Sequence, residues 1–297
     1  MRLLYLVSGF SRGGTNILWN LVCSHPGVLS TGFELNEILG PTATDISYFQ
    51  KGIIESFVIP GIKPPKRICQ FVKDRIVLTA EENAKKSWGR MKSSTTFYSD
   101  SEIRSLPVCT KAVNSWSRDW LFTLLKRNLA LKYTPLLRAT GTRLLTLYLI
   151  RDAEAQCNGW MRRGCTAIEA GRWYRNIVEC MLNDYEQRPN EVMFVRFENV
   201  LNDPLGTVER TYQFLELQPL QMDEFHLKSK KMLRNDGSHD VVRGFEGEMM
   251  WVSRSDIPGF IDSGVDARQR KHLSVSDRSK LFEMLGDISK RLECVMG

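Results

Sequence analysis

The first residues with the potential for chemistry lie in a glycine-rich segment close to the N-terminus. The segment SGFSRGGTN, residues 8–16, separates an apolar run at residues 3–7 from a second apolar run that begins at Ile17 with helical spacing. This order predicts a strand, a tight loop and a helix. Glycines let the backbone turn its amides inward, and the N-terminus of a helix favours negative charge. We therefore expect the loop to bind an anionic group such as a phosphate.

The loop departs from the pattern of the P-loop ATPases, which requires Lys and then Ser or Thr directly after its last glycine. It resembles instead the Arg/Lys-Ser-Gly-Thr-Thr loop with which the PAPS-dependent sulfotransferases bind the 5′-phosphosulfate of 3′-phosphoadenosine 5′-phosphosulfate (PAPS). Arg12 takes the place of the basic residue, and Gly14 and Thr15 match. Gly13 and Asn16 replace the family's Ser and Thr. The resemblance assigns donor binding to these five residues.

A second segment, residues 144–164, is similar to the family's 3′-phosphate motif. An apolar strand ends at Arg151, and a helix follows at once. In the family an Arg ends this strand, and a Ser eight positions later faces the same phosphate. Arg151 matches, whereas Gly159 stands at the position of the Ser. The resemblance implies that both positions face the 3′-phosphate, and Asn158 or a main-chain amide is left to supply the second contact.

Two further segments follow the pattern of the same family. Residues 195–217 resemble its strand-loop-helix segment, in which Asp203 and Pro204 form a helix cap followed by proline in the first turn, so a structural role is indicated. A basic run near the C-terminus falls where the family places a loop over the 3′-phosphate. On this resemblance we assign Arg268 and Arg270 to donor binding.

Sulfuryl transfer also requires a cation near the transferred group and a base that takes a proton from the acceptor. Arg12 is expected to neutralise the leaving phosphate. Lys111 lies on a predicted strand, at a place similar to that of a strand-borne Lys in several sulfotransferases. Glu34 follows the His-Pro turn at residues 25–26 much as the catalytic Glu does in tyrosylprotein and some bacterial sulfotransferases, and we predict that it is the base. Glu37 is the alternative carboxylate.

Composition fits one medium-sized enzyme. With 297 residues, of which 42% are apolar, the chain is long enough to bury a large core. It has no run of eighteen apolar residues, no Cys-x-x-Cys pair among seven cysteines, and only four scattered histidines. We therefore expect a cytoplasmic protein without a membrane span or a bound metal. The net charge of +7 is spread over separate polar runs without interleaved aromatics, which argues against nucleic acid and suits an anionic donor.

Strands and helices alternate along the chain, which predicts an α/β fold of P-loop-like, three-layer type, with a central, mostly parallel sheet and helices on both faces. A single domain is expected over 1–297, with acceptor-binding insertions at 40–107 and 218–262. Because ligands of such sheets bind beyond the carboxyl ends of the strands, both phosphate loops are expected to share one crevice. The pattern predicts strands at 2–8, 67–73, 108–113, 144–150 and 192–197, and helices near 80–92 and at 115–130. It predicts an irregular stretch from the first helix to about residue 66 and a loop-rich segment at 218–272.

These matches identify the chain as resembling a PAPS-dependent sulfotransferase, closer to bacterial and tyrosylprotein types than to aryl and steroid types. Such an enzyme moves a sulfuryl group from PAPS to a hydroxyl or amine of a small molecule or saccharide and releases adenosine 3′,5′-bisphosphate (PAP). One alternative is an atypical nucleotide kinase, in which Asp152 would imitate the Walker-type acid and a metal would be needed. The other is an inactive PAP-binding scaffold, motivated by Gly13, Asn16 and Gly159.

Overall fold

A computed structural model gives the fold. The structure describes residues 2–11, 13–38, 65–114, 133–218, 221–233, 239–242, 244, 247–261, 263–270 and 272–296. Arg12, the helix predicted at 115–130 and much of the first predicted insertion lie outside these residues.

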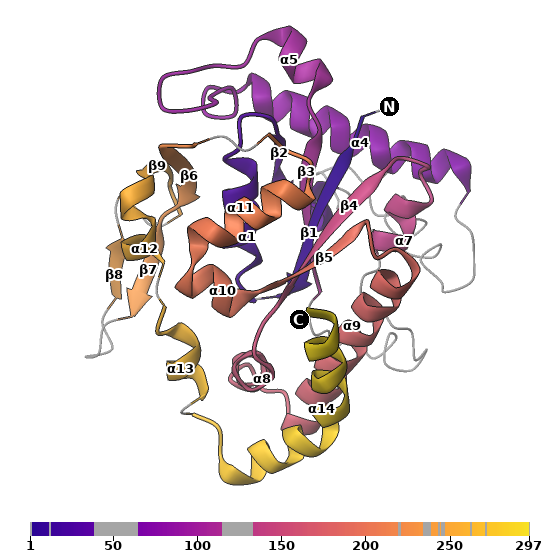
Figure 1. Cartoon of the computed structure of the whole chain (residues 1–297), viewed down its shortest axis with the longest axis vertical. Coiled ribbons are helices and arrows are strands. Elements are labelled where there is room, and N and C mark those ends of the chain that lie inside the picture. Colours follow the sequence, from indigo (N-terminus) through magenta and orange to yellow (C-terminus); the bar gives the residue numbers. More distant parts are fainter. Residues whose placement is uncertain are drawn as a thin grey trace.

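A five-stranded sheet forms the centre of the molecule, and its neighbouring strands run parallel (Figure 1). The strand order is β2-β3-β1-β4-β5. Every residue of β1 and β4 is buried, as expected for inner strands of a sheet that is covered on both faces. The predicted α/β architecture with a parallel central sheet is confirmed. The strands are β1 (Leu4–Phe10), β2 (Leu29–Glu34), β3 (Val108–Asn114), β4 (Leu144–Ile150) and β5 (Val192–Arg196).

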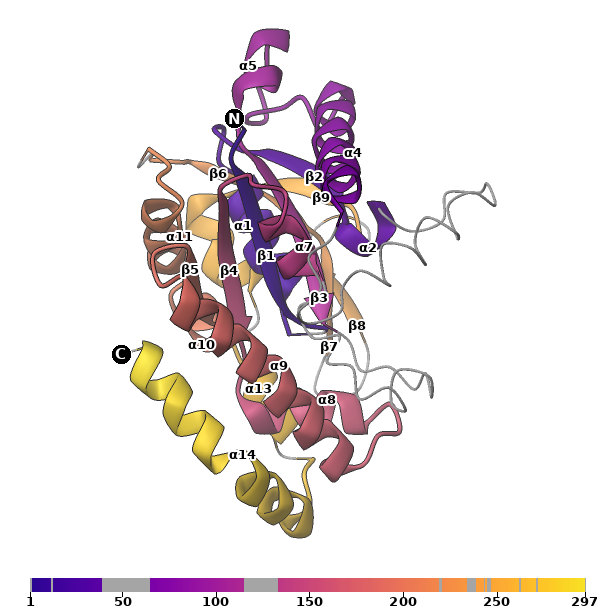
Figure 2. The same cartoon turned by 90° about the vertical axis from the view of Figure 1, so that its right-hand side faces the viewer.

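Helices cover both faces of the sheet, and Figure 2 shows α4 and α11 on opposite sides of it. Successive side chains of a strand point to opposite faces. In β4, Leu147 and Leu149 therefore pack with α1 and α11, whereas Tyr148 and Ile150 pack with α8, α9 and α14. One face carries α1 (Thr15–Cys23), α10 (Phe197–Asn202) and α11 (Pro204–Phe214). The other carries α4 (Lys66–Lys85), α7 (Tyr133–Arg138), α8 (Ala153–Met161), α9 (Ala167–Gln187) and α14 (Val275–Met296).

Shorter elements complete the fold. The segment predicted as loop-rich contains, within its described residues, two antiparallel strand pairs, β6 with β9 and β7 with β8, and the short helices α12 and α13. These elements and the remaining ones are α2 (Leu35–Ile38), α5 (Asp100–Ser105), β6 (Glu224–Lys228), β7 (Lys230–Leu233), β8 (His239–Val242), β9 (Met249–Ser253), η1 (Arg254–Asp256), α12 (Ile257–Phe260) and α13 (Val265–Arg270).

The strand predicted at residues 67–73 is wrong, because this segment is the first part of α4. The short apolar run ICQFV fits either a strand or one face of a buried helix, and the longer pattern decides between them. The helix predicted near 80–92 is the C-terminal part of the same α4, which ends at Lys85. The buried residues of α4 recur at helical spacing: Cys69, Val72, Ile76, Ala80 and Ala84.

The carboxyl ends of the parallel strands meet at one edge of the sheet. The glycine-rich loop follows β1 at this edge, Arg151 follows β4, and Phe197 follows β5. The local caps agree with the sequence: Asp203 accepts a hydrogen bond from the amide of Gly206 at the start of α11, with Pro204 in the first turn. The sheet therefore brings the predicted phosphate-binding segments to the same side of the molecule.

Candidate functional site

The glycine-rich loop leads directly into α1. Gly14 has a left-handed backbone with φ of 91°, and a Cβ atom on it would lie 2.1 Å from the Phe197 ring. Only glycine meets both demands. The amide of Gly13 donates to the carbonyl of Phe10 at 2.9 Å. Thr15 is the first residue of α1 and is buried, so the loop leads directly into a helix N-terminus, which is suited to an anion.

Helix α8, which follows Arg151, braces this loop from the other side. The Gln156 side-chain amide donates to the carbonyl of Ser11 at 3.1 Å, and the Trp160 indole donates to the Ser11 hydroxyl at 3.2 Å. A Cβ atom on Gly13 would lie 3.2 Å from Gln156 Oε1 and 2.9 Å from the carbonyl oxygen of Phe10. The space that the family's Ser would need is therefore taken, which gives a packing reason for glycine at this position.

Lys111, Glu34 and Asn16 come together between β3, β2 and α1. Glu34 and Lys111 are partners in the strand pairing, and Lys111 Nζ lies 2.8 Å from Glu34 Oε1. The same ammonium group donates to Asn16 Oδ1 and lies 4.8 Å from the centre of the Trp19 ring. The Lys111 side chain is 3% exposed and that of Glu34 28%, so the lysine is held fast while the carboxylate keeps contact with solvent. This cluster unites two predicted catalytic residues with one predicted donor-binding residue.

Glu37 and His25 both form hydrogen bonds with the backbone. Glu37 Oε2 accepts a hydrogen bond from the amide of Glu34 at 2.7 Å, so it fixes the end of β2. His25 Nδ1 accepts from the amide of Gly27 at 2.9 Å, and His25 Nε2 lies 3.0 Å from the carbonyl oxygen of Gln218. Burial lowers the pKa of His25, which keeps it in the neutral form that this turn requires. The interpretation of His25 as a turn residue is confirmed.

Arg151 is buried at the same edge of the sheet, where we expect the other end of the crevice. Its Nε donates to Asp266 Oδ1 at 2.8 Å, and its Nη2 donates to the same oxygen. Its guanidinium carbon lies 5.0 Å from the centre of the Phe197 ring, the ring that also covers Gly14. Phe197 therefore joins the predicted 5′-phosphosulfate loop to the predicted 3′-phosphate arginine. The Tyr174 hydroxyl donates to the carbonyl of Arg151 at 2.8 Å and fixes the backbone.

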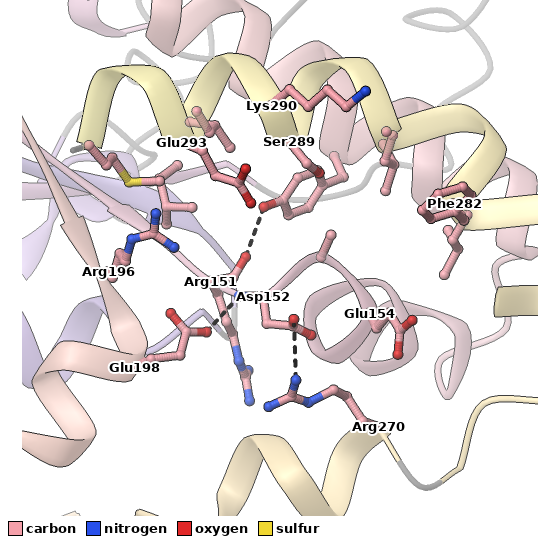
Figure 3. A pocket seen from close by; sticks show the side chains of 18 residues that line it. Arg151, Asp152, Glu154, Arg196, Glu198, Arg270, Phe282, Ser289, Lys290 and Glu293 are labelled. Atoms are coloured by element: carbon pink, nitrogen blue, oxygen red, sulfur yellow. Dashed lines mark hydrogen bonds and ion pairs between the residues drawn. The ribbon is translucent and has the colours of Figure 1, made fainter.

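A pocket of about 610 Å³, lined by both charged and apolar side chains, lies between α14 and the segment that follows β4 (Figure 3). Asp152 caps α8 by accepting from the amide of Ala155 at 2.8 Å, and its other oxygen lies 3.6 Å from Arg270 Nη1. The amide of Asp152 donates to Glu198 Oε1 at 2.8 Å. Burial raises the pKa of Glu198, and the nearby charge of Asp266 adds to this rise. Asp152 is thus committed to a helix cap and an ion pair.

The remaining predicted residues lie around the same edge of the sheet. Gly159 is half-buried on α8, and Arg268 is half-buried on α13. Sequence reasoning missed Asp266, Phe197 and Glu198. A signal for Asp266 was present, because this residue lies two positions before Arg268 in the basic run near the C-terminus. Only the basic residues of that run were considered. Phe197 and Glu198 lie in the segment interpreted as purely structural.

The described residues contain no cluster of three or more His, Cys, Asp or Glu side chains that could hold a metal ion. Among the helices of the described ranges, none is long and apolar enough to cross a membrane. The expectation that the reaction needs no metal stays a prediction.

Comparison with known proteins gives similarity at the level of structure. No protein-family model and no curated protein matches the chain. Similar solved structures include the sulfotransferase domain from the curacin biosynthetic pathway, with 12% identity, coverage of 96% of this chain and 98% of that chain, and a TM-score of 0.47. The sulfotransferase domain from the Synechococcus PCC 7002 olefin synthase has 13% identity, coverage of 96% and 94%, and a TM-score of 0.46. Retinol dehydratase in complex with androsterone and PAP has 10% identity, coverage of 97% and 81%, and a TM-score of 0.40.

Proposed function

We propose that this protein is a PAPS-dependent sulfotransferase that moves a sulfuryl group to a hydroxyl or amine and releases PAP. The observation that carries the proposal is the contact of Lys111 with both Glu34 and Asn16 beside the N-terminus of α1. A cation for the transferred group, a carboxylate for the acceptor proton and an anion-binding loop thereby lie together. Sulfuryl transfer needs these three functions, and positioning and charge neutralisation supply most of its catalysis.

Each residue has a stated task in the proposed reaction. Glu34 accepts the proton of the acceptor as the acceptor oxygen or nitrogen forms a bond to sulfur. The bond between sulfur and the bridging phosphate oxygen breaks, and that oxygen leaves with PAP. Lys111 contacts the transferring group, and Arg12 neutralises the charge that grows on the leaving phosphate. Asn16 and Trp19 keep the Lys111 ammonium in place.

The fit of the donor differs between its two ends. The loop at Gly14 suits a 5′-phosphosulfate, because it ends directly before the N-terminus of α1, which favours an anion. Gly14 has a left-handed backbone and no room for a Cβ atom, so the chain can turn into the helix at this point. Arg151 suits a 3′-phosphate by its chemistry, since guanidinium groups bind phosphate oxygens through paired N–H donors. We assign Gly159, Arg268 and Arg270 to the same end of the donor.

The wider organisation is part of the same proposal. A single domain spans 1–297, and the segments 40–107 and 218–262 supply the acceptor pocket. The acceptor is a small molecule or a saccharide, no nucleic acid or membrane takes part, and the protein works in the cytoplasm. The described helices and strands of the first acceptor segment are α4 and α5, and those of the second are β6, β7, β8, β9, η1 and α12.

The two alternatives make different demands on the same residues. A nucleotide kinase would need Asp152 for a metal, yet this carboxylate caps α8 and pairs with Arg270. An inactive PAP-binding scaffold would not need Glu34 to stay in contact with solvent, and its side chain is 28% exposed. Both observations favour the sulfotransferase.

Thermal unfolding with nucleotides tests the proposal. A ligand that binds only the native state raises its Tm by mass action. We expect PAP to raise the Tm without magnesium, and to do so more than ADP or ATP. A rise that occurs only with ATP and magnesium would favour the kinase. A mass-spectrometric assay with PAPS and a panel of phenols, alcohols, amines and saccharides then separates a transferase from a scaffold that binds PAP without turnover.

A further inference from the structure

The arginine assigned to the 3′-phosphate already holds an anion from its own chain. Two nitrogens of Arg151 donate to Asp266 Oδ1, and both side chains are 4% exposed. Figure 3 shows the Arg151 side chain running away from α14. The carboxylate of Asp266, which belongs to α13, thus takes donors that a phosphate would use, because guanidinium groups bind carboxylates and phosphates through the same N–H groups.

This internal pair is incompletely satisfied. Asp266 Oδ2 is buried, and no donor among the described residues reaches it. The half-buried Glu198 carboxyl lies within hydrogen-bonding reach of Asp266, and the charge of Asp266 adds to the desolvation that raises the pKa of Glu198. A buried acceptor without a partner and a like-charged neighbour both oppose the pair. A phosphate offers three terminal oxygens in place of one well-bonded carboxylate oxygen, so it is suited to replace Asp266.

We propose that Asp266 is a donor-selectivity residue that competes with the 3′-phosphate for Arg151. This inference rests on the proposed function, because it assumes that the donor places its 3′-phosphate at Arg151. Asp266 neutralises the arginine when no donor is bound, and a nucleotide with a 3′-phosphate must displace it. The affinity gained from the 3′-phosphate is therefore reduced by the free energy of the Arg151–Asp266 pair. A nucleotide without that phosphate leaves the pair intact.

Titration calorimetry with two nucleotides tests the competition. PAP and adenosine 5′-monophosphate (AMP) differ only in the 3′-phosphate, so the ratio of their affinities isolates the contact at Arg151. Asp266→Asn keeps the shape of the side chain and removes its charge. We expect PAP to bind this variant about tenfold more tightly than it binds the wild type, the scale of one charge-assisted hydrogen bond. The affinity for AMP should change less than about twofold.

Asp184→Asn is the matched control. Asp184 Oδ2 lies 3.2 Å from Arg138 Nη2, and these side chains are 11% and 10% exposed, so the chain contains a second largely buried Arg–Asp pair. Arg138 also donates to Thr146 near the start of β4, at the opposite edge of the sheet from Arg151. This variant should leave the ratio of PAP to AMP affinity unchanged. An equal change in both variants would mean a general effect of broken ion pairs and would overturn the proposal.

The outcomes separate this inference from the proposed function. If the wild type binds PAP and Asp266→Asn binds it equally or less tightly, Asp266 does not compete, and the inference alone is wrong. If neither protein binds PAP, both the inference and the proposed function are wrong. A structure of the wild type with PAP avoids any folding defect of the variant. It should show the 3′-phosphate on Arg151 and Asp266 displaced, and an intact Arg151–Asp266 pair with PAP bound would overturn the inference.

Discussion

Lys111 on β3 and Arg151 after β4 flank the same central strand, β1, but their partners differ. Lys111 pairs with Glu34, whose side chain is 28% exposed, across two neighbouring strands. Arg151 pairs with Asp266, whose side chain is 4% exposed, across more than a hundred residues of chain. The first pair keeps a carboxylate within reach of a substrate. In the second pair, both the cation and the anion are buried away from solvent.

The difference follows from the elements that hold each partner. Strand register fixes Glu34 beside Lys111, so this pair is part of the sheet and needs no ligand for its assembly. Asp266 lies on the short helix α13, outside the sheet. We infer that the end of the crevice at Lys111 is preassembled for chemistry, whereas the end at Arg151 holds an internal anion that a ligand exchanges.

Removal of the proposed base should have the largest effect. Glu34→Gln keeps the shape of the side chain and removes its ability to accept a proton. We expect kcat to fall by roughly a hundred- to ten-thousandfold, the usual contribution of general base catalysis. PAP should still bind with near wild-type affinity, because Lys111 and the loop remain. Steady-state kinetics and PAP titration on the same preparations measure the two quantities.

Glu37→Gln is the control for the base. Its side-chain oxygen can still accept the hydrogen bond that the Glu34 amide donates at 2.7 Å, so kcat should stay within a few-fold of the wild type. A larger loss from Glu37→Gln than from Glu34→Gln would transfer the role of base to Glu37. The end of the crevice at Lys111 would then lack the preassembled base that distinguishes it from the end at Arg151.

Replacement of Arg151 or Lys111 by methionine should lower the free energy of unfolding by different amounts. Arg151→Met leaves Asp266 buried without its partner, which costs about 3–5 kcal/mol of unfolding free energy. Lys111→Met leaves Glu34 in contact with water, and we expect a cost of about 1–2 kcal/mol. Urea unfolding of both variants measures the difference. Equal costs would contradict the contrast between an enclosed pair and an accessible one.

The end at Lys111 was predictable from sequence where its residues are tied to predicted strands and helices. An apolar run before a glycine-rich loop indicates β1 and α1, and a lysine in the run VCTKAV indicates a strand that carries it. Glu34 lies in the stretch predicted to be irregular up to about residue 66, where the structure has β2 (Leu29–Glu34). The direct pairing of Glu34 with Lys111 therefore comes from the structure alone.

The end at Arg151 was predictable only in part. Arg151 itself follows from a strand that ends in a charge. The pairing of Arg151 with Asp266 depends on how α13 packs against α8, which no local pattern encodes. The same limit explains the wrong strand at residues 67–73, where a short apolar run was read without the longer helical period that surrounds it.

A substitution at Gly159 should change PAP binding at the end near Arg151 by a smaller amount. If this residue faces the 3′-phosphate, Gly159→Ser adds a hydroxyl donor and should tighten PAP binding by about 0.5–1.5 kcal/mol, the net value of a hydrogen bond. Gly159→Ala is the control, because it gains the same kind of helix propensity without a hydroxyl. Calorimetry at one fixed salt concentration compares the three proteins. Equal PAP affinity in the Ser and Ala variants would place Gly159 away from the phosphate.

The smallest expected effect concerns the pH dependence of stability at the same end. Burial raises the pKa of Glu198, with a further contribution from the charge of Asp266. Between its ordinary pKa and the raised one, the native state binds more protons than the unfolded state, so this carboxyl destabilises the protein increasingly as the pH rises through that window. Glu198→Gln keeps an oxygen that can accept from the amide of Asp152, which Glu198 Oε1 contacts at 2.8 Å. The Tm of this variant relative to the wild type should therefore increase from pH 4.5 to pH 7.5.

A second carboxylate gives the opposite expectation and serves as the control. The hydrogen bond from Arg143 lowers the pKa of Glu216, so this exposed group stabilises the native state above its ordinary pKa, and the contribution is lost as the pH falls. The Tm of Glu216→Gln relative to the wild type should therefore stay nearly constant from pH 4.5 to pH 7.5 and rise only as the pH falls below 4.5. Thermal unfolding of the three proteins at several pH values measures both slopes. A relative Tm of Glu198→Gln that stays constant would show that Glu198 is hydrated in the native state, and that the surroundings of Arg151 are as open to water as those of Glu34.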